Sequence, residues 1–190
     1  IDKSRTLTYM LADGQSGHSF FEVTVQDNGG TANGGVDTSA PQTFMTNVLI
    51  AKINVREGGL NLLKGDTYDF GKVALGGRQT QVFTIDDIGL YELLLTGSPH
   101  KVILLDNQAA NFSVDETNTT NFIGAGNNST FSLTLTPSQL GTTSATVVIP
   151  NTDLRNTSYS FNVTGTGVPA KMLQVSLTGN GTGSITSDPT

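Results

Sequence analysis

The sequence predicts an all-β protein: an immunoglobulin-like antiparallel β-sandwich flanked by partial β modules. The segment Thr130–Pro137 alternates, which places Phe131, Leu133 and Leu135 on one face and hydroxyl side chains on the other. About eight short segments of this kind, separated by Gly, Asn and Pro, fall between Tyr68 and Val168, and that number is typical of an immunoglobulin-like sandwich. Helical spacing is almost absent, so a helical or mixed architecture is not expected.

The first segment, residues 1–53, holds a strand at Phe21–Val25, a long turn at Asp27–Asp37 and a second strand near Thr43–Ile53. The alternation predicts that the apolar residues of the first strand face inward, namely Phe21, Val23 and Val25. Three strands at most cannot close a sandwich. We therefore expect this segment to be the C-terminal part of a domain.

Residues 54–66 show weak periodicity and contain Gly58-Gly59, so we expect a linker there. The sandwich is expected over residues 67–168, with Gly165–Ala170 as a short connection to the next module. A fresh alternating pattern over residues 169–190 predicts the start of a further β-rich repeat. The strands expected within the sandwich are Tyr68–Val73, Thr80–Asp86, Tyr91–Leu95, Val102–Leu105, Phe112–Val114, Thr130–Thr136, Ser144–Ile149 and Tyr159–Thr164.

Composition excludes several classes of function. The net charge is −6 and the basic residues are scattered singly, so no basic stripe could neutralise nucleic-acid phosphates or anionic lipid. The absence of Cys rules out disulfides and thiolate metal sites. No apolar run approaches the length of a membrane span, so no membrane insertion is expected in this segment. The chain starts without a leader pattern at Ile1 and stops in mid-pattern, so we expect a piece of a longer protein.

The central segment resembles the bacterial branch of the Hydin-like (ASH) immunoglobulin-type domains of "choice-of-anchor D" surface proteins. The resemblance begins at Asp69-Phe70-Gly71-Lys72-Val73 and covers about a hundred residues. One departure lies at Asp87-Ile88-Gly89, where the family usually has N-T-G, which predicts an unusually exposed Ile88. The other matching segments are Val82–Ile85, Ala109–Val114, Ile123–Gly126, Ser129–Phe131, Leu135–Pro137, Gly141–Thr146 and Phe161–Gly167.

The flanks resemble other bacterial surface repeats. Residues Val23–Ser39 and Gln42–Phe44 resemble the tail of a cadherin-like or Ig-like repeat, and the third segment resembles the opening strand of another repeat. These resemblances imply an exported, surface-facing setting, and neither family brings catalytic residues. They also imply neighbouring β modules of the same chain as partners.

Two motifs are candidates for catalysis. Ser16 lies between glycines and beside His18 in Gly14–His18, but the second Gly comes one residue too early for a nucleophile elbow and no helix follows. His100 follows Ser98-Pro99, which predicts a solvated turn, and His18 and His100 fall in different modules. The glycine-rich stretch Gly179–Ser184 precedes a strand rather than a helix, so a hairpin turn is expected instead of a phosphate site. We expect no catalytic residues.

One loop carries a candidate metal site. Asp27, Asn28, Asn33 and Asp37 place hard oxygen ligands on one turn, which is what calcium prefers, although the spacing is not that of an EF-hand. The cadherin-like resemblance favours calcium, whereas the alternative is turn chemistry in which Asn, Asp and Gly make local backbone bonds. The pairs Asp66 with Asp69 and Asp86 with Asp87 are expected to be turn residues.

A glycan ligand would need exposed aromatic rings, and the chain has no Trp and four Tyr. Tyr68 and Tyr91 are the aromatic candidates on the surface of the central module, and Tyr91 could equally belong to the core. The leading hypothesis is therefore a non-enzymatic spacer or adhesion module, extracellular or at a cell surface. The alternatives are a calcium- or glycan-binding module, a protein ligand on a flat face, or an accessory domain of a secreted hydrolase.

Overall fold

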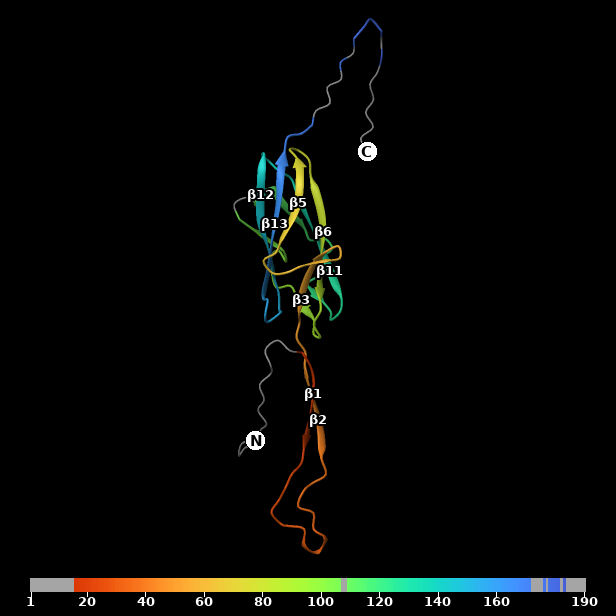
Figure 1. The fold of residues 1–190 in the computed structure, drawn as a ribbon, viewed down its shortest axis with the longest axis vertical. Helices are drawn as coiled ribbons and strands as arrows, with labels where there is room; N and C mark the ends of the chain where they lie inside the picture. Colours follow the sequence, from red (N-terminus) through yellow and green to blue (C-terminus); the bar gives the residue numbers. More distant parts are fainter. Residues whose placement is uncertain (1–15, 107–108, 172–175, 177, 182, 184–190) are drawn as a thin grey trace.

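Two β-sheets pack face to face in the computed structural model, which describes residues 16–106, 109–171, 176, 178–181 and 183 (Figure 1). The first sheet has the order β4 (Leu60–Leu62), β3 (Ile53–Glu57), β6 (Gln79–Asp87), β11 (Asn128–Leu135) and β9 (Phe112–Asp115). The second has the order β5 (Thr67–Ala74), β13 (Ser158–Val168), β12 (Gly141–Pro150) and β8 (Ile103–Leu105). The predicted all-β immunoglobulin-like sandwich is confirmed.

Two smaller ribbons complete the described strands. β7 (Leu93–Leu94) pairs with β10 (Phe122–Ile123) at one end of the sandwich, and β1 (Gly17–Val23) pairs with β2 (Gln42–Val48) in a hairpin. Short 3₁₀ turns occupy Ala32–Gly34 and Ala109–Asn111. The expected third segment, residues 169–190, lies largely outside the described residues.

One strand pair departs from the antiparallel prediction. β5 runs parallel to β13, with Asn162 opposite Thr67 and Val168 opposite Ala74. Every other pair of named strands in the described residues is antiparallel. Most of the sandwich separates β5 from β13 in sequence, and a long connection of this kind permits a parallel pair, which a tight hairpin does not.

The alternating pattern explains the core. In β11 the residues Phe131, Leu133 and Leu135 are at most 1% exposed, whereas the hydroxyl side chains between them are only partly buried. The matching inward residues of β6 and β13 include Phe83 and Phe161, both fully buried. Sheets that bury one face in this way are held together by the apolar area removed from water.

Phe83 lies where the two sheets meet. Its ring stacks on Phe131 of the neighbouring strand, with centroids 5.4 Å apart, and lies 5.5 Å from Phe161 in the opposite sheet. Tyr68 of β5 meets the same ring edge-on at 5.1 Å. Contacts of this kind add to the hydrophobic gain of burial, so Phe83 joins four strands from both layers.

The predicted linker at residues 54–66 is wrong over most of its length. β3 and β4 occupy it, and β3 pairs with β6 from Ile53 opposite Asp87 to Glu57 opposite Phe83. Val55 and Leu62 belong to the buried core. Three-residue β4 and the Gly58-Gly59 turn are too short to show periodicity, which is why the sequence pattern did not reveal this hairpin.

The predicted connection at Gly165–Ala170 is also displaced. β13 continues to Val168, so Pro169 and Ala170 are the first residues beyond the strand. Alternating glycines in Gly165-Thr166-Gly167 resemble a loop in sequence, yet both lie within the sheet. Glycine is needed at these two positions because neighbouring groups approach too closely for a side chain.

The β1–β2 hairpin does not contribute to the sandwich core, whose buried apolar residues lie between Ala51 and Val163. Phe21 and Val23 are half-buried, but Val25 is 67% exposed, so its predicted inward position is wrong. The hairpin also exposes Phe20, Phe44 and Met45. A two-stranded ribbon has no second layer against which to bury such residues.

Replacing Phe83 by Ala is expected to lower the free energy of unfolding by about 3–5 kcal/mol, because it removes a fully buried ring and leaves a cavity between the sheets. Urea denaturation followed by circular dichroism measures this. Val82→Thr is the control, since Val82 is the next residue on the same strand but is 52% exposed. Its effect should stay within about 0.5 kcal/mol. Equal effects of the two variants would contradict the assigned core.

Candidate functional site

The predicted calcium loop joins β1 to β2. The Asp27 N–H donates to the carbonyl of Asp37 at 2.9 Å, which brings these two residues together at the base of the loop. Asp27 Oδ1 accepts the Gly29 N–H at 2.7 Å, the local bond of an Asx turn. Asn28 and Asn33 are exposed, and Asn33 has a left-handed backbone with φ of 58°.

Local bonds therefore account for part of this loop. Asp37 Oδ1 also accepts the Thr38 hydroxyl at 3.1 Å. Within the described ranges, no group of three or more His, Cys, Asp or Glu side chains is placed to hold a metal ion. Calcium at Asp27, Asn28, Asn33 and Asp37 stays a prediction.

Each of the two histidines has its own hydrogen-bond partner, and the two do not meet. His18 lies on β1, and its Nδ1 is 2.6 Å from Oδ1 of Asn47 on the paired strand. His100 is 71% exposed at its side chain, and its Nδ1 lies 3.2 Å from Glu116 Oε2. The other carboxylate oxygen of Glu116 accepts the Val102 N–H at 2.6 Å, which ties the start of β8 to the end of β9.

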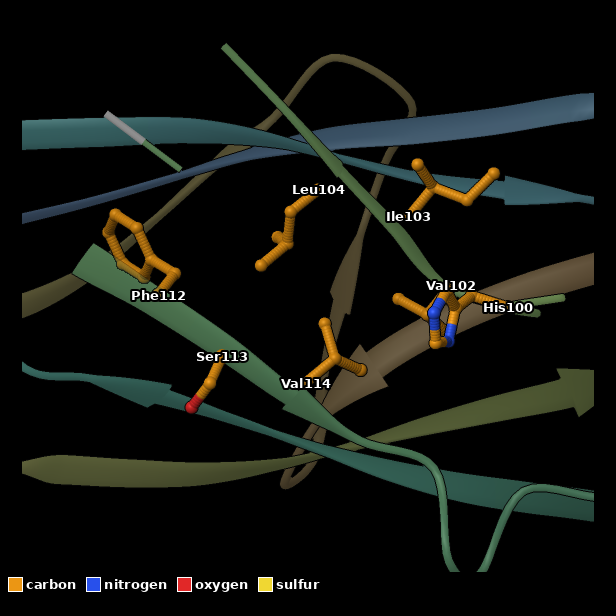
Figure 2. Close-up of a pocket in the computed structure, with 7 residues that line it drawn as sticks. All are labelled: His100, Val102, Ile103, Leu104, Phe112, Ser113 and Val114. Atoms are coloured by element: carbon orange, nitrogen blue, oxygen red, sulfur yellow. The ribbon is translucent and has the colours of Figure 1, made fainter. Parts of the chain in front are cut away.

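A groove of about 300 Å³ lies between β8 and β9, the outermost strands of the two sheets on the same side of the sandwich (Figure 2). Its floor is apolar, with Val102 and Phe112 buried and Leu104 and Val114 packed against the core. β8 has three residues and β9 has four, so each offers only a short unpaired backbone edge.

The groove contains a serine and a histidine, but they are not arranged as a nucleophile and its base. Figure 2 shows Ser113 and His100 at well-separated places along the groove, with Val114 and Val102 in the space between them. The imidazole meets Glu116 instead. A base acting on a serine must lie within hydrogen-bond reach of it.

A set of backbone bonds fastens the chain where it enters the sandwich. We call Ile50–Ile53 the junction segment. The carbonyl of Ile50 accepts the N–H groups of Leu90 and Tyr91 at 2.9 and 3.2 Å, and the carbonyl of Lys52 accepts Ile88 N–H at 2.9 Å. Gly89 allows this approach, since a Cβ there would lie 2.3 Å from the Ile50 oxygen.

Two buried carboxylates complete the junction. Asp87 is 1% exposed, and its Oδ1 accepts the N–H groups of Lys52 and Gly89 at 3.3 and 2.9 Å. Asp153 is 2% exposed and reaches from the β12–β13 loop, where its Oδ2 accepts the Ile53 N–H at 3.1 Å. Buried carboxylates are tolerated when they accept hydrogen bonds in this way.

Of the four aspartates expected in turns, Asp66 lies in a connection, whereas Asp69 lies on β5 and Asp86 and Asp87 lie on β6. Asp66 Oδ2 accepts the Leu63 N–H at 2.8 Å and Asp69 Oδ1 accepts the Gly71 N–H at 2.8 Å, both local bonds. Asp87 makes the expected local bond to Gly89 as well as its bond to the junction. Asp86 instead pairs with Arg56 at 2.9 Å.

Asp153 was missed by sequence reasoning. In the sequence, Asp153 lies between β12 and β13 in Asn151-Thr152-Asp153, a pattern typical of an ordinary turn. The Asp153 Oδ1 does accept the Arg155 N–H at 2.9 Å, as a turn residue would. Nothing in the pattern indicates that its second oxygen bonds to Ile53, a hundred residues earlier.

Of the two tyrosines expected on the surface, Tyr91 is exposed and Tyr68 packs against the core. Tyr68 packs against Phe70 and Phe83, and burial followed by the charge of Glu57 raises its pKa. Tyr91 is 53% exposed and lines an apolar groove of about 220 Å³ beside the junction, with Leu49 and Leu154. Ile88 is 53% exposed, as its departure from the family pattern predicts.

No family model matches the sequence, and no curated protein matches it. Several solved structures are similar. The chain matches the ASH / PapD-like domain of human CEP192 with 11% identity and a TM-score of 0.45, over 64% of this chain and 89% of that one. A protein of unknown function from Porphyromonas gingivalis W83 matches with 12% identity and a TM-score of 0.47, over 82% and 68%. Domains 4 and 5 of the S-layer protein SbsC match with 15% identity and a TM-score of 0.36, over 80% and 70%. Likenesses of this degree assign neither a family nor a function.

Among the described residues, no helix is long and apolar enough to cross a membrane.

If the predicted calcium site exists, calcium should slow amide exchange of the Asp27 N–H, because a bound ion opposes opening of the loop. Hydrogen exchange of residues 24–41 is compared in calcium and in a chelator. This measurement follows the loop itself, whereas unfolding of the sandwich would not report on the hairpin. Asp37→Asn should abolish the difference. Identical exchange rates in calcium and chelator would remove the site.

Replacing Asp153 by Ala is expected to destabilise the protein by about 1–3 kcal/mol, because the buried Ile53 N–H loses its acceptor. Asp115→Ala is a matched control, because the Asp115 carboxylate accepts the same kind of local bond, from the Thr117 N–H at 2.9 Å. Hydrogen bonds from the Thr117 hydroxyl and N–H lower the pKa of Asp115. The control is expected to have the smaller effect in urea denaturation. Faster exchange of the Ile53 amide in Asp153→Ala alone would assign the effect to the junction, whereas unchanged exchange would refute that role.

Proposed function

We propose that this chain is a non-enzymatic spacer module of a multidomain bacterial surface or secreted protein, and that it works at the cell surface or outside the cell. The observation that carries the proposal is the path of the chain. The chain enters the sandwich at the junction segment and leaves it at the end of β13, and Figure 1 places these points at opposite ends of the two sheets. A domain of this form separates its neighbours by its own length.

Both ends are fastened, which a spacer requires. The junction segment is held by Asp87, Asp153 and the backbone of residues 88–91. At the opposite end the carbonyl of Val168 accepts the Leu75 N–H at 2.9 Å. Fixed ends transmit the orientation of the sandwich to the segments on either side.

The side of the sandwich opposite the groove is also closed. Residues Leu63–Asp66 cross from β4 to β5, and the hydroxyl of Tyr159 in the second sheet donates to the carbonyl of Leu62 in the first. Burial, followed by the charge of Asp66, raises the pKa of Tyr159, a shift in favour of the protonated phenol that donates this bond. The cross-link limits sliding of one sheet against the other.

The hypothesis of an ASH-type domain from a "choice-of-anchor D" protein agrees with this role, because such domains are expected to hold shape rather than to catalyse. The described grooves also favour it, since no base lies beside Ser113 and no group of three metal-binding side chains occurs in the described residues. Calcium or a glycan remains an alternative ligand, and Tyr91 and Phe122 are exposed aromatic rings of the sandwich that a sugar would meet.

Spin labels at Leu49→Cys and Ala170→Cys should give one narrow, long distance by pulsed electron resonance, because both ends of the sandwich are fixed. The chain contains no Cys, so the labels attach only at the introduced sites. Leu49→Cys with Leu154→Cys is the control, since both residues line one groove and should give a short distance. A broad distribution for the first pair would overturn the spacer function.

A further inference from the structure

We propose that the sandwich resists tension along the chain and that the parallel pair β5–β13 is the contact that must shear before it unfolds. This inference rests on the proposed spacer function and deepens it. A spacer in an exported, multidomain chain is pulled from its two ends. Here those pulls act at the junction segment and at the end of β13.

The strand directions decide how the bonds meet this force. β5 and β13 run the same way, toward the end where the chain leaves (Figure 1). Tension pulls β13 forward from its C-terminal end, and it pulls β5 backward from its N-terminal end. Bonds between parallel strands are evenly spaced along the pair and slant from one strand across to the other, so shear loads the whole row at once. They therefore stretch together, and no bond at one end can open before the others.

The shared ladder is longer than the strand pair itself. Near its beginning, Gly65 N–H donates to Ser160 and Asn162 N–H donates to Asp66, at 2.8 and 2.7 Å. At its far end, Leu75 N–H donates to the carbonyl of Val168 at 2.9 Å. On its other side β13 pairs with β12 from Ser158 to Gly167. The strand that carries the pull is therefore held on both sides over most of its length.

The register of β13 resists sliding as well. A Cβ at Gly165 would lie 2.3 Å from Leu135 Cδ2 and 3.3 Å from Phe70 Cβ. Forward movement of β13 by two residues keeps its faces but carries Val163 into this position. The side chain of Val163 would then collide with Leu135 in the core. The bulge between Thr164 and Thr166 fixes the same register from the β5 side.

The force reaches β5 through β3 and β4. β3 meets β6 over five residues, from Ile53 to Glu57, and β4 pairs only with β3 over three residues. This contact is shorter than the ladder along β13. We expect β3 and β4 to detach at lower force, after which β5–β13 sets the highest force of the unfolding trace.

Force spectroscopy in two pulling directions tests the proposal. Handles at Leu49→Cys and Ala170→Cys load β5–β13 in shear. Handles at Gln139→Cys and Ala170→Cys pull apart Gly141 and Gly167, which are paired at one end of β12–β13, so these bonds open in succession. The first direction should require the higher rupture force. Equal forces, or a higher force in the second direction, would overturn the proposal.

Leu75→Pro isolates one bond of the ladder. Leu75 precedes Gly76 (φ of 79°) in a turn closed by the Gly77 N–H and the Ala74 carbonyl, and Pro is favoured at that position. The substitution removes the N–H that bonds to Val168, and it also replaces the leucine side chain. The unfolding rate at constant force should rise about fivefold, the effect of one hydrogen bond.

Two controls separate that bond from other effects of the substitution. Leu75→Ala shortens the side chain but keeps the N–H. Ala125→Pro places Pro in a similar turn, before Gly126 (φ of 77°), where the Ala125 N–H bonds to nothing among the described residues. Neither control should speed unfolding under force, and urea denaturation checks that all three variants fold.

An unchanged rate in Leu75→Pro, or an equal rise in either control, would overturn the role of β5–β13. The spacer function fails by a different result, a broad distance between labels at the two ends. A narrow distance together with equal rupture forces would leave the spacer intact and refute only the resistance to tension.

Discussion

The contact between Phe83 and Phe161 across the two sheets is the interaction on which the rest of the structure depends. The rings come from β6 and β13, and Phe131 and Tyr68 pack against the same centre. Because both sheets must present an apolar face at this point, the alternation of each central strand is fixed, and a shift by one residue would turn its core residues to solvent. The outward hydroxyl rows, the positions of the strand ends and the two fastened termini all follow from that register.

Buried polar side chains hold the chain in place where it enters the sandwich, as buried apolar side chains hold the two sheets together in the middle. Asp87 and Asp153 are as buried as the core residues, yet most of their oxygens serve backbone N–H groups of the junction and nearby turns. Oδ2 of Asp87 has no hydrogen-bond partner among the described residues. Burying carboxylates costs free energy. Here these carboxylates fix the path of the chain between the hairpin and β3. The β1–β2 hairpin, by contrast, has no buried core and owes its place to that path.

Sequence reasoning reached the sandwich because Phe131, Leu133 and Leu135 obey a period of two that no other element imitates. It failed where the determining contact is distant. β3 and β4 lack a long pattern, and their membership in the sheet depends on β6. Tyr68 looked exposed and Tyr91 ambiguous because a single tyrosine carries no sign of what lies across the sheet. For the candidate site, the turn bond of Asp27 followed from residue type, whereas the link from Asp153 to Ile53 joins residues that no local rule connects.

Three of the four outermost strands of the two sheets are short: β4 and β8 have three residues and β9 has four, whereas β5 has eight. A long flat border strand is a template on which another molecule can add its own strand, and this is a common origin of aggregation among β proteins. Here three of the four borders offer little continuous backbone, and the long strands β11, β12 and β13 lie inside their sheets. The fourth border, β5, is interrupted by the irregularity that follows Asp69. The consequence is that many copies can be crowded together without merging their sheets.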